Sequence, residues 1–294
     1  MNNNSTVFAV CGVFNHLEDT KRLLKSIRKQ NYSKIKTFII DDGSTDGTPE
    51  YIYKRYSETV VLRGHGNLWW TGSMKWAVEE VIKVAHSGDF ILTINNDCIF
   101  DKNYVQLLVD SSLKFKRAIV GSLAVDKNDR NSIYDAGMKI DWKRGKIISL
   151  GPQYLNELQE SQLYQEDINI LSTKGTLYPV EVFRRVGNFD QKHFPHYLSD
   201  YEFSCRAKKN GFKLILSYQS IVYNDTIRTG LWKNKKGILG LKEIWDLLFS
   251  RRSKVNIIDN FKFIKYCCPK EYKFRNYLYL LIKLIISGYR LLLS

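Results

Sequence analysis

Two apolar runs near the start of the chain, separated by one amphipathic segment, constrain the fold more than any other feature. Residues 7–14 are almost entirely apolar, residues 35–40 form a second run, and apolar residues recur at helical spacing between them. A strand, a helix and a second strand in this order predict a right-handed βαβ unit with parallel strands. We therefore expect an α/β fold with a mostly parallel sheet flanked by helices.

A third apolar run, residues 90–94, predicts a buried strand that ends on Asn95, Asn96 and Asp97. In open α/β sheets, ligands bind beyond the carboxyl ends of the strands. One carboxylate and two amides at that place can hold a hard cation, Mg²⁺ or Mn²⁺, that bridges phosphate oxygens. The alternative is an Asx-rich turn that only closes the strand.

The second strand also ends in acidic residues, Asp41 and Asp42, which begin the turn 41–48. This turn has neither the glycines of a dinucleotide-binding loop nor the lysine of a P-loop. It offers carboxylates, which suit hydrogen bonds to a base or a ribose. A glycine-flanked loop, residues 63–73, follows and contains Trp69 and Trp70, which could stack on a sugar ring or pack in the core.

Further elements follow the central strand. We expect a helix over 104–114, a return to the sheet at 118–120, a surface hairpin within 126–151 and a short helix from Pro179. Ser199 and Glu202 have the spacing of a capping box, which would begin another helix. Two strands, 213–217 and 220–223, then lead to a loop with Gly230, Gly237 and Gly240 around Trp232 that could close over a ligand.

Composition narrows the class of protein. The five cysteines are odd in number and lack CxxC spacing, which argues against a disulfide framework or a zinc site and favours reduced thiols in the cytoplasm. The N-terminus has no basic segment of the kind that begins a signal peptide. Ten of the fifteen net positive charges lie in residues 233–294. In the part of the chain before this tail, positive residues are not interleaved with aromatic residues on one face, so nucleic acid is a poor candidate partner.

The basic tail itself predicts a helix at an anionic membrane surface. Its polar residues recur on one helical stripe, namely Asn276, Lys283, Ser287, Arg290 and Ser294. A spanning helix would place Lys283 near the bilayer centre at a cost of about 2.5–3.5 kcal/mol, whereas at an interface it stays wet. We expect peripheral contact with the inner face of the cytoplasmic membrane. The alternative is that the apolar face packs on the rest of the chain or on a second subunit in a homodimer.

Taken in order, these motifs resemble the inverting family 2 glycosyltransferases of the GT-A fold, particularly bacterial rhamnosyltransferase-like members that build O-antigen or capsule. The resemblance covers roughly Val7 to Asp225. It implies a Rossmann-like catalytic domain over 1–232, with a nucleotide-binding half of about 1–122 and an acceptor half of about 123–232. Residues 233–294 would form a helical basic appendage.

The resemblance also implies roles for single residues. Asp97 stands at the metal-binding position of the family's DxD motif, with Asn95 replacing the first carboxylate, and Asp200 stands at the position of the catalytic base, with Ser199 replacing the usual Glu. Asn224 and Asp225 occupy the place where relatives carry a histidine ligand. The implied donor-binding residues are Phe14, Asn15, Asp41, Asp42, Asn67, Trp69, Trp70, Gly72, Asn95 and Asn96. The implied acceptor-binding residues are Gly175, Thr176, Tyr197, Glu202 and Arg206.

The implied reaction moves a sugar from a nucleotide-diphosphate sugar, dTDP-rhamnose or a UDP-sugar, to a saccharide or lipid-linked acceptor. A divalent cation would neutralise the leaving diphosphate, and one carboxylate would accept the acceptor's proton. Two rival interpretations are a sugar nucleotidyltransferase, whose glycine-rich basic signature is missing, and a non-catalytic carbohydrate-binding relative. Retention of both Asp97 and Asp200 argues against the second.

Overall fold

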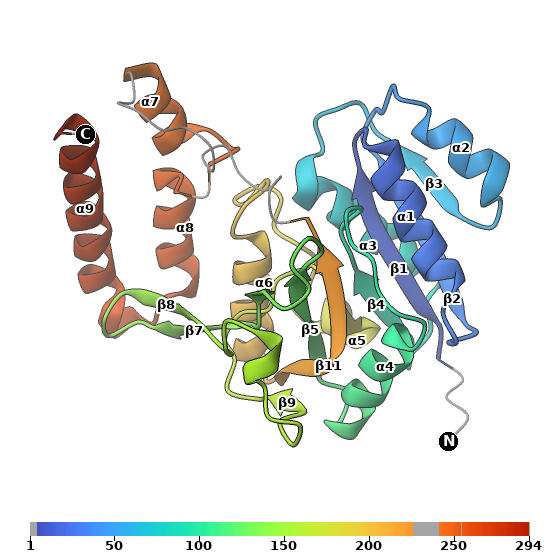
Figure 1. Ribbon diagram of the computed structural model, residues 1–294. Coiled ribbons are helices and arrows are strands. Elements are labelled where there is room, and N and C mark those ends of the chain that lie inside the picture. Colours follow the sequence, from blue (N-terminus) through green and yellow to red (C-terminus); the bar gives the residue numbers. More distant parts are fainter. Residues whose placement is uncertain (1–4, 226–240, 254, 294) are drawn as a thin grey trace.

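The expected parallel βαβ unit begins the structure, a computed structural model that describes residues 5–225, 241–253 and 255–293 (Figure 1). In this part of the chain a nine-stranded sheet has the order β3-β2-β1-β4-β10-β5-β11-β9, with β6 beside β5. Its strands are β1 (Val7–Val13), β2 (Ile35–Asp41), β3 (Val60–Arg63), β4 (Phe90–Thr93), β5 (Ile119–Asp126), β6 (Ile133–Asp135), β9 (Tyr164–Gln165), β10 (Thr176–Pro179) and β11 (Leu214–Asn224). The sheet is parallel from β3 to β4 and again between β5 and β11, whereas β10 runs antiparallel between β4 and β5. The predicted mostly parallel α/β fold is confirmed.

Helices cover both faces of this sheet, which is why its strands read as continuous apolar runs. The helices are α1 (Leu17–Arg28), α2 (Thr48–Arg55), α3 (Trp69–Val84), α4 (Tyr104–Lys114), α5 (Val180–Val186) and α6 (Ser199–Lys209), with a short 3₁₀ helix at Leu155–Glu157. Phe8 of β1 belongs to a core with side chains of α3, α5 and α6. Its neighbour Val7 belongs to a second core with side chains of α1, α2 and α4. Both cores thus lie against β1.

Three local features, namely the predicted hairpin, the strands at 213–223 and the start of α6, are compared with their predictions below in chain order. The predicted hairpin is present as β7 (Met138–Asp141) paired with β8 (Lys146–Ser149), although β6 joins the main sheet. The two strands expected at 213–223 are one strand, β11, because it pairs with β5 on both sides of an irregularity between Ser217 and Ile221. The prediction of a capping box at Ser199 and Glu202 was wrong. The residue before α6 is Leu198, at φ 63°, and no side chain caps the helix.

The C-terminal residues fold back onto the α/β part. They form α7 (Leu241–Phe249), α8 (Ile257–Cys267) and α9 (Lys270–Leu293), and Figure 1 shows α8 and α9 beyond α6. Phe263 and Cys267 of α8 lie in a buried cluster with Cys205 of α6. Asn276 of α9 is buried and donates to the carbonyl oxygen of Trp142 at 2.7 Å, so it is not part of a wet stripe as predicted. Part of the tail therefore packs on the rest of the chain, whereas Phe274 and Leu281 of α9 remain exposed.

All five cysteines are free and buried, in agreement with the absence of a disulfide framework. A search of the described residues finds no helix with the length and apolar content needed to cross a membrane. The glycine-rich loop expected to close over a ligand, with Gly230, Trp232 and Gly237, lies outside the described residues, as does the proposed boundary at 232.

Candidate active site

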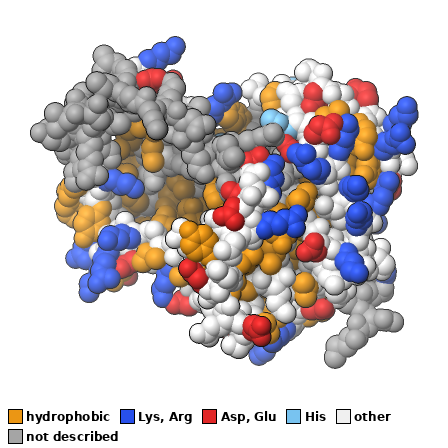
Figure 2. Space-filling view, in the orientation of Figure 1, with side chains coloured by type: hydrophobic (Ala, Val, Ile, Leu, Met, Phe, Trp, Pro, Cys, Tyr) orange, Lys and Arg blue, Asp and Glu red, His pale blue; other side chains and the backbone are white. Residues whose placement is uncertain are grey.

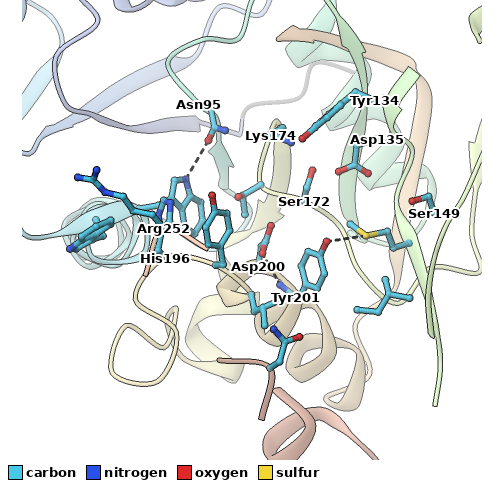
Figure 3. A pocket seen from close by; sticks show the side chains of 18 residues that line it. Asn95, Tyr134, Asp135, Ser149, Ser172, Lys174, His196, Asp200, Tyr201 and Arg252 are labelled. Atoms are coloured by element: carbon cyan, nitrogen blue, oxygen red, sulfur yellow. Dashed lines mark hydrogen bonds between the residues drawn. The ribbon is translucent and has the colours of Figure 1, made fainter. Parts of the chain in front are cut away.

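A cavity of about 870 Å³ lies where β4, β6, β10 and α6 meet, and it holds several predicted site residues (Figure 3). The chain reaches it from five places: the start of α3, the end of β4, the β6–β8 region, the segment before β10 and the start of α6. The turn between α7 and α8 adds a sixth. The lining residues are Trp69, Trp70, Asn95, Tyr134, Asp135, Met138, Ile147, Ser149, Ser172, Thr173, Lys174, His196, Tyr197, Leu198, Asp200, Tyr201, Arg252 and Asn260.

Asp200, the predicted base, lines this cavity from the first turn of α6. Its carboxylate accepts a hydrogen bond from the backbone N–H of Tyr201 at 3.0 Å. Burial raises the pKa of Asp200 to about 6, the charge of Lys174 opposes that rise, and Asp135 adds to it. A carboxylate with this pKa is ionised at neutral pH yet basic enough to take a proton from a hydroxyl group, which is what a general base requires.

Lys174 is a cation in the cavity that sequence reasoning did not assign. Its ammonium lies 4.0 Å from the ring centroid of Tyr134. No carboxylate of the described residues forms an ion pair with it. Its charge lowers the pKa of Asp200 and that of Asp97, so it stands near both carboxylates. No motif marks this lysine, and only the fold brings it to Asp200.

Asp97 follows β4 next to the end of β11. The backbones of Ile99 and Tyr223 exchange two hydrogen bonds of 2.9 Å, which brings Asn224 and Asp225 close to the Asp97 loop. Burial raises the pKa of Asp97, and the negative charge of Asp225 contributes to the rise. Both side-chain polar atoms of Asn224 are buried without a hydrogen-bond partner.

This set of oxygen donors fits a hard divalent cation. Asp97 and Asp225 supply carboxylates and Asn224 an unpartnered amide, the ligand types that Mg²⁺ and Mn²⁺ prefer. Asp225 also forms an ion pair of 2.7 Å with Lys127. Within the described residues, no group of three or more His, Cys, Asp and Glu side chains could hold a metal by itself. Amides or substrate oxygens would therefore have to complete the coordination.

Asp42 lies at the end of β2 and holds the tryptophan loop. Its buried carboxylate accepts hydrogen bonds from the backbone N–H groups of Gly66 and Leu68, both at 2.8 Å, and of Trp69 at 3.3 Å. A Cβ at Gly64 would lie 2.6 Å from its Oδ1, so the loop needs glycine there. The carboxylate that we expected to face a base thus positions Trp69.

Six other residues predicted to bind the donor lie outside this cavity. Asp41 is buried, with Ser44 N–H bonded to Oδ1 and Arg63 Nε 3.1 Å from Oδ2. Asn15 accepts from the N–H of Thr45 at 3.0 Å, which ties the end of β1 to the acidic turn. Phe14 is exposed, Asn67 lines a second hollow, and Gly72 is buried against Gln191. Asn96 lines neither hollow.

The two tryptophans pack on other aromatic rings and also line the cavity. Trp70 lies with its ring centroid 5.5 Å from that of Phe189, a core residue, and its Nε1–H donates to Asn95 at 3.3 Å. Trp69 lies 5.5 Å from the ring of His196. Both also line the cavity, so their stacking on a sugar ring stays a prediction that this position allows.

Of the predicted acceptor-binding residues, Tyr197 lines the cavity and the others do not. Gly175 and Thr176 are tied into the sheet at the start of β10, and the preceding residues 172–174 line the cavity in their place. Glu202 and Arg206 form a two-pronged ion pair with both distances 2.7 Å. Arg206 also donates to the carbonyl oxygens of Val186, the last residue of α5, and of Asn188, so this pair fastens α6 to the end of α5.

Comparisons with known proteins concern the family and the fold. The family described as "Glycosyl transferase family 2" matches residues 9–187. The chain is 24% identical over 213 residues to an N-acetylglucosaminyl-diphospho-decaprenol L-rhamnosyltransferase of Mycobacterium tuberculosis, and the match covers 67% of each protein.

Two solved structures resemble the fold. A structure of GalNAc-T7 with UDP, GalNAc and Mn²⁺ has a TM-score of 0.58 at 17% identity; the match covers 76% of this chain but only 44% of that one. The mannosyltransferase PcManGT from Pyrobaculum calidifontis, in complex with GDP-Man and Mn²⁺, has a TM-score of 0.56 at 13% identity, and the match covers 93% and 68% of the two chains. At these identities the likeness concerns the fold, which is the one expected from the sequence.

Proposed function

This chain belongs to glycosyltransferase family 2, and we propose on that basis that it transfers a sugar from a nucleotide-diphosphate sugar with inversion, using Asp200 as the base. The observation that carries the proposal is the position of Asp200. Its carboxylate, with a pKa of about 6, lines a cavity large enough for sugar rings beside two tryptophans. No other carboxylate of the predicted site combines that pKa with a place on the cavity wall.

The chemistry needs one proton acceptor and one leaving group. An acceptor hydroxyl in the cavity gives its proton to Asp200 while its oxygen bonds to the anomeric carbon of the donor sugar. The bond from that carbon to the nucleotide diphosphate breaks, and the electron pair leaves with the diphosphate. A single displacement of this kind inverts the anomeric centre and needs no carboxylate nucleophile.

A divalent cation, Mg²⁺ or Mn²⁺, would neutralise the charge of the leaving diphosphate. Asp97, Asp225 and the amide of Asn224 are the residues that would hold it. The Mn²⁺ in the structures of the two similar proteins supports a cation of this kind. The order of the predicted donor residues, along the ends of β1, β2 and β4, supports a nucleotide on that side of the cavity.

The relative from M. tuberculosis guides the choice of substrates. Its name gives an L-rhamnosyl donor and an acceptor in which N-acetylglucosamine is joined to a polyprenol through a diphosphate. We place dTDP-rhamnose first among donors, followed by UDP-sugars, and a lipid-linked saccharide as the acceptor. Such a reaction fits the synthesis of a bacterial surface polysaccharide such as O-antigen or capsule.

A lipid-linked acceptor calls for contact with a membrane, and α8 and α9 offer a surface for it. Phe274 is 83% exposed, and Phe261, Leu278, Leu281 and Ile282 are exposed on the same two helices. Figure 2 shows hydrophobic side chains beside Lys and Arg over the region that these helices occupy in Figure 1. Exposed apolar side chains among cations favour an anionic lipid surface. We therefore propose peripheral contact with the cytoplasmic membrane, with pairing of two subunits as the rival use of this face.

A donor panel tests the function. The purified chain is incubated with Mn²⁺ or Mg²⁺, an N-acetylglucosaminyl-diphospho-prenol acceptor and each candidate nucleotide sugar, and the anomeric configuration of the product is read by NMR. We expect one donor to be used with inversion and Asp200→Asn to reduce turnover at least about 10²-fold while donor binding persists. Donor binding without transfer or hydrolysis in any mixture would instead favour a carbohydrate-binding protein. Retention of near-normal turnover by Asp200→Asn would rule out the base.

Sedimentation with vesicles tests the membrane contact. The full chain should sediment with vesicles that contain anionic lipid and be released by high salt, because the attraction of surface cations is screened. Substitution of Phe274 and Leu281 by Ser keeps the tail in place and should weaken sedimentation. A dimer by light scattering that these substitutions break, without sedimentation, would assign the face to a second subunit.

A further inference from the structure

The turn between α7 and α8 contributes two neighbouring arginines to the candidate active site. Arg252 lines the main cavity, which also holds Asp200. Arg251 lines the second hollow, of about 430 Å³, beside Asn67 and Trp69. Trp69 belongs to the walls of both, so the two arginines line hollows that share one tryptophan. This part of the tail is therefore a wall of the site.

Among the residues that the structure describes, Arg252 has no carboxylate partner. Its guanidinium carbon lies 5.8 Å from the ring centroid of Trp69. Across the described residues, no carboxylate forms an ion pair with Arg252 or Arg251. A guanidinium left without a carboxylate at the wall of a cavity is suited to two-pronged binding of phosphate oxygens.

His196 supplies a second observation at the same place. Figure 3 shows it next to Arg252, and its Nδ1 is buried without a hydrogen-bond partner. Burial, together with the charge of Arg252, lowers the pKa of His196 to about 4, so the ring is neutral at physiological pH. His196 lines the main cavity, and buried ring nitrogens normally have a hydrogen-bond partner, so this part of the wall has hydrogen-bonding capacity that the described residues leave unused.

The second hollow continues this positive region. Lys192 and Lys75 line it together with Arg251. Lys75 also forms an ion pair with Glu79, with 3.4 Å between Nζ and Oε1. Asp190, the acidic residue of its wall, is already bonded to the ring of His193. The wall of this hollow thus carries three cations and one carboxylate, and Arg251 also opposes the rise that burial causes in the pKa of Asp259 of α8.

We infer that Arg252, together with Arg251 and His196, forms a subsite for the diphosphate group of a lipid-linked acceptor. The inference rests on the proposed function and names the part of the acceptor that the tail recognises. Six of the predicted donor residues lie at or just after the ends of β1, β2 and β4, whereas Asn67 and Trp69 line the two hollows together with the arginines. Arg252 itself enters from the turn before α8, which packs on α6, the helix that carries the base. An acceptor whose prenyl chain lies against the exposed face of α8 and α9 would present its diphosphate to this turn and its sugar to Asp200.

Two acceptors with the same sugar separate this role from others. One is N-acetylglucosaminyl-diphospho-farnesol, and the other is octyl N-acetylglucosaminide, which has no phosphate. Arg252→Gln should raise KM for the first acceptor about tenfold, as expected for loss of a charge-assisted contact, and change KM for the second less than about twofold. Arg252→Lys should recover part of the loss. Lys270→Gln is the matched control, because it removes the same charge from an exposed tail position that lines neither hollow.

Farnesyl diphosphate provides a readout that does not depend on the acceptor sugar. Calorimetry in the presence of a saturating nucleoside diphosphate should detect its binding to the wild type and weaker binding to Arg252→Gln and to Arg251→Gln. Equal loss of activity with both acceptors, or unchanged binding of farnesyl diphosphate, would overturn the inference while leaving the transferase assignment intact. A raised KM for the donor alone would place these arginines on the donor's diphosphate. Loss of vesicle sedimentation alone would place them on lipid headgroups.

Discussion

The ammonium of Lys174 and the carboxylate of Asp200 line one cavity, and the charge of the lysine lowers the pKa that burial of the aspartate raises. The two effects leave Asp200 with a pKa of about 6, between that of an exposed carboxyl group and that of a fully desolvated one. The segment before β10 and the first turn of α6 therefore set the strength of the base together.

Turnover should depend on pH through this carboxyl group. Protonated Asp200 cannot accept the acceptor's proton, so kcat/KM should fall as the pH drops through about 6 and level off above it. A rate profile between pH 4.5 and 8.5, with donor binding measured at each pH, checks this. A profile flat from pH 5 upward would mean that another group is the base.

Replacement of Lys174 by Met should move the pH at which kcat/KM falls. Without the ammonium, only backbone hydrogen bonds oppose the effects of burial and Asp135 on Asp200, so its pKa rises and the midpoint of the pH profile moves to higher pH. Lys174→Arg should keep the midpoint near its original place. A uniform loss of rate at every pH, or a higher KM for the donor with an unmoved midpoint, would show that Lys174 acts on the substrates or on packing.

Removal of the metal should weaken donor binding. If Asp97 holds the cation, chelation by EDTA and the substitution Asp97→Ala should each abolish the part of donor affinity that depends on Mn²⁺ or Mg²⁺. Titration of the donor with and without metal measures that part. Asp101→Ala, a change on an exposed residue four positions along the chain, should retain it. Metal-independent binding by the wild type would refute the prediction.

Substitution of Asp42 by Ala should loosen the tryptophan loop. Three backbone N–H groups lose their acceptor, and a buried donor left unpaired costs about 1–3 kcal/mol, so the free energy of unfolding should fall by about 2 kcal/mol or more. Donor affinity should fall as well, because Trp69 loses its support. Hydrogen exchange of residues 64–69 gives the local readout. Unchanged protection there would contradict the assigned role of this carboxylate.

Arg206→Ala should act on stability and leave acceptor binding unchanged. The substitution leaves Glu202 as a buried carboxylate without its partner, which costs about 3 kcal/mol. Thermal unfolding should therefore shift down, and replacement of both residues by apolar ones of similar size should recover much of the loss. A higher KM for the acceptor at unchanged stability would restore the role first expected from the sequence.

The main features of the fold could be predicted from the sequence because their signals are local. Strands buried on both faces appear as continuous apolar runs, and β1, β2 and β4 were found within a residue or two for this reason. The end of a predicted strand locates Asp97, whereas the role of Asp200 as the base comes from the resemblance to the family's motif. Both roles stay predictions.

The partners of these residues could not be predicted, because they come from distant parts of the chain. Nothing in the turn after β2 indicates that Asp42 accepts from the loop after β3, and nothing near Lys174 indicates Asp200. The spacing of Glu202 and Arg206, four residues apart, is that of a helical ion pair, and it could have warned against an acceptor role. Packing of the tail on α6 depends on shape, which periodicity does not encode.

The cluster that joins Cys205 of α6 to Phe263 and Cys267 of α8 limits how far this protein can be treated as a set of exchangeable modules. The same short helix carries the base at its first turn and the tail's contact on its flank. A chimera that takes only residues 241–293 from a relative would set foreign side chains against the helix that positions Asp200. Grafting the tail without the facing residues of α6 should therefore damage catalysis before it changes where the enzyme works.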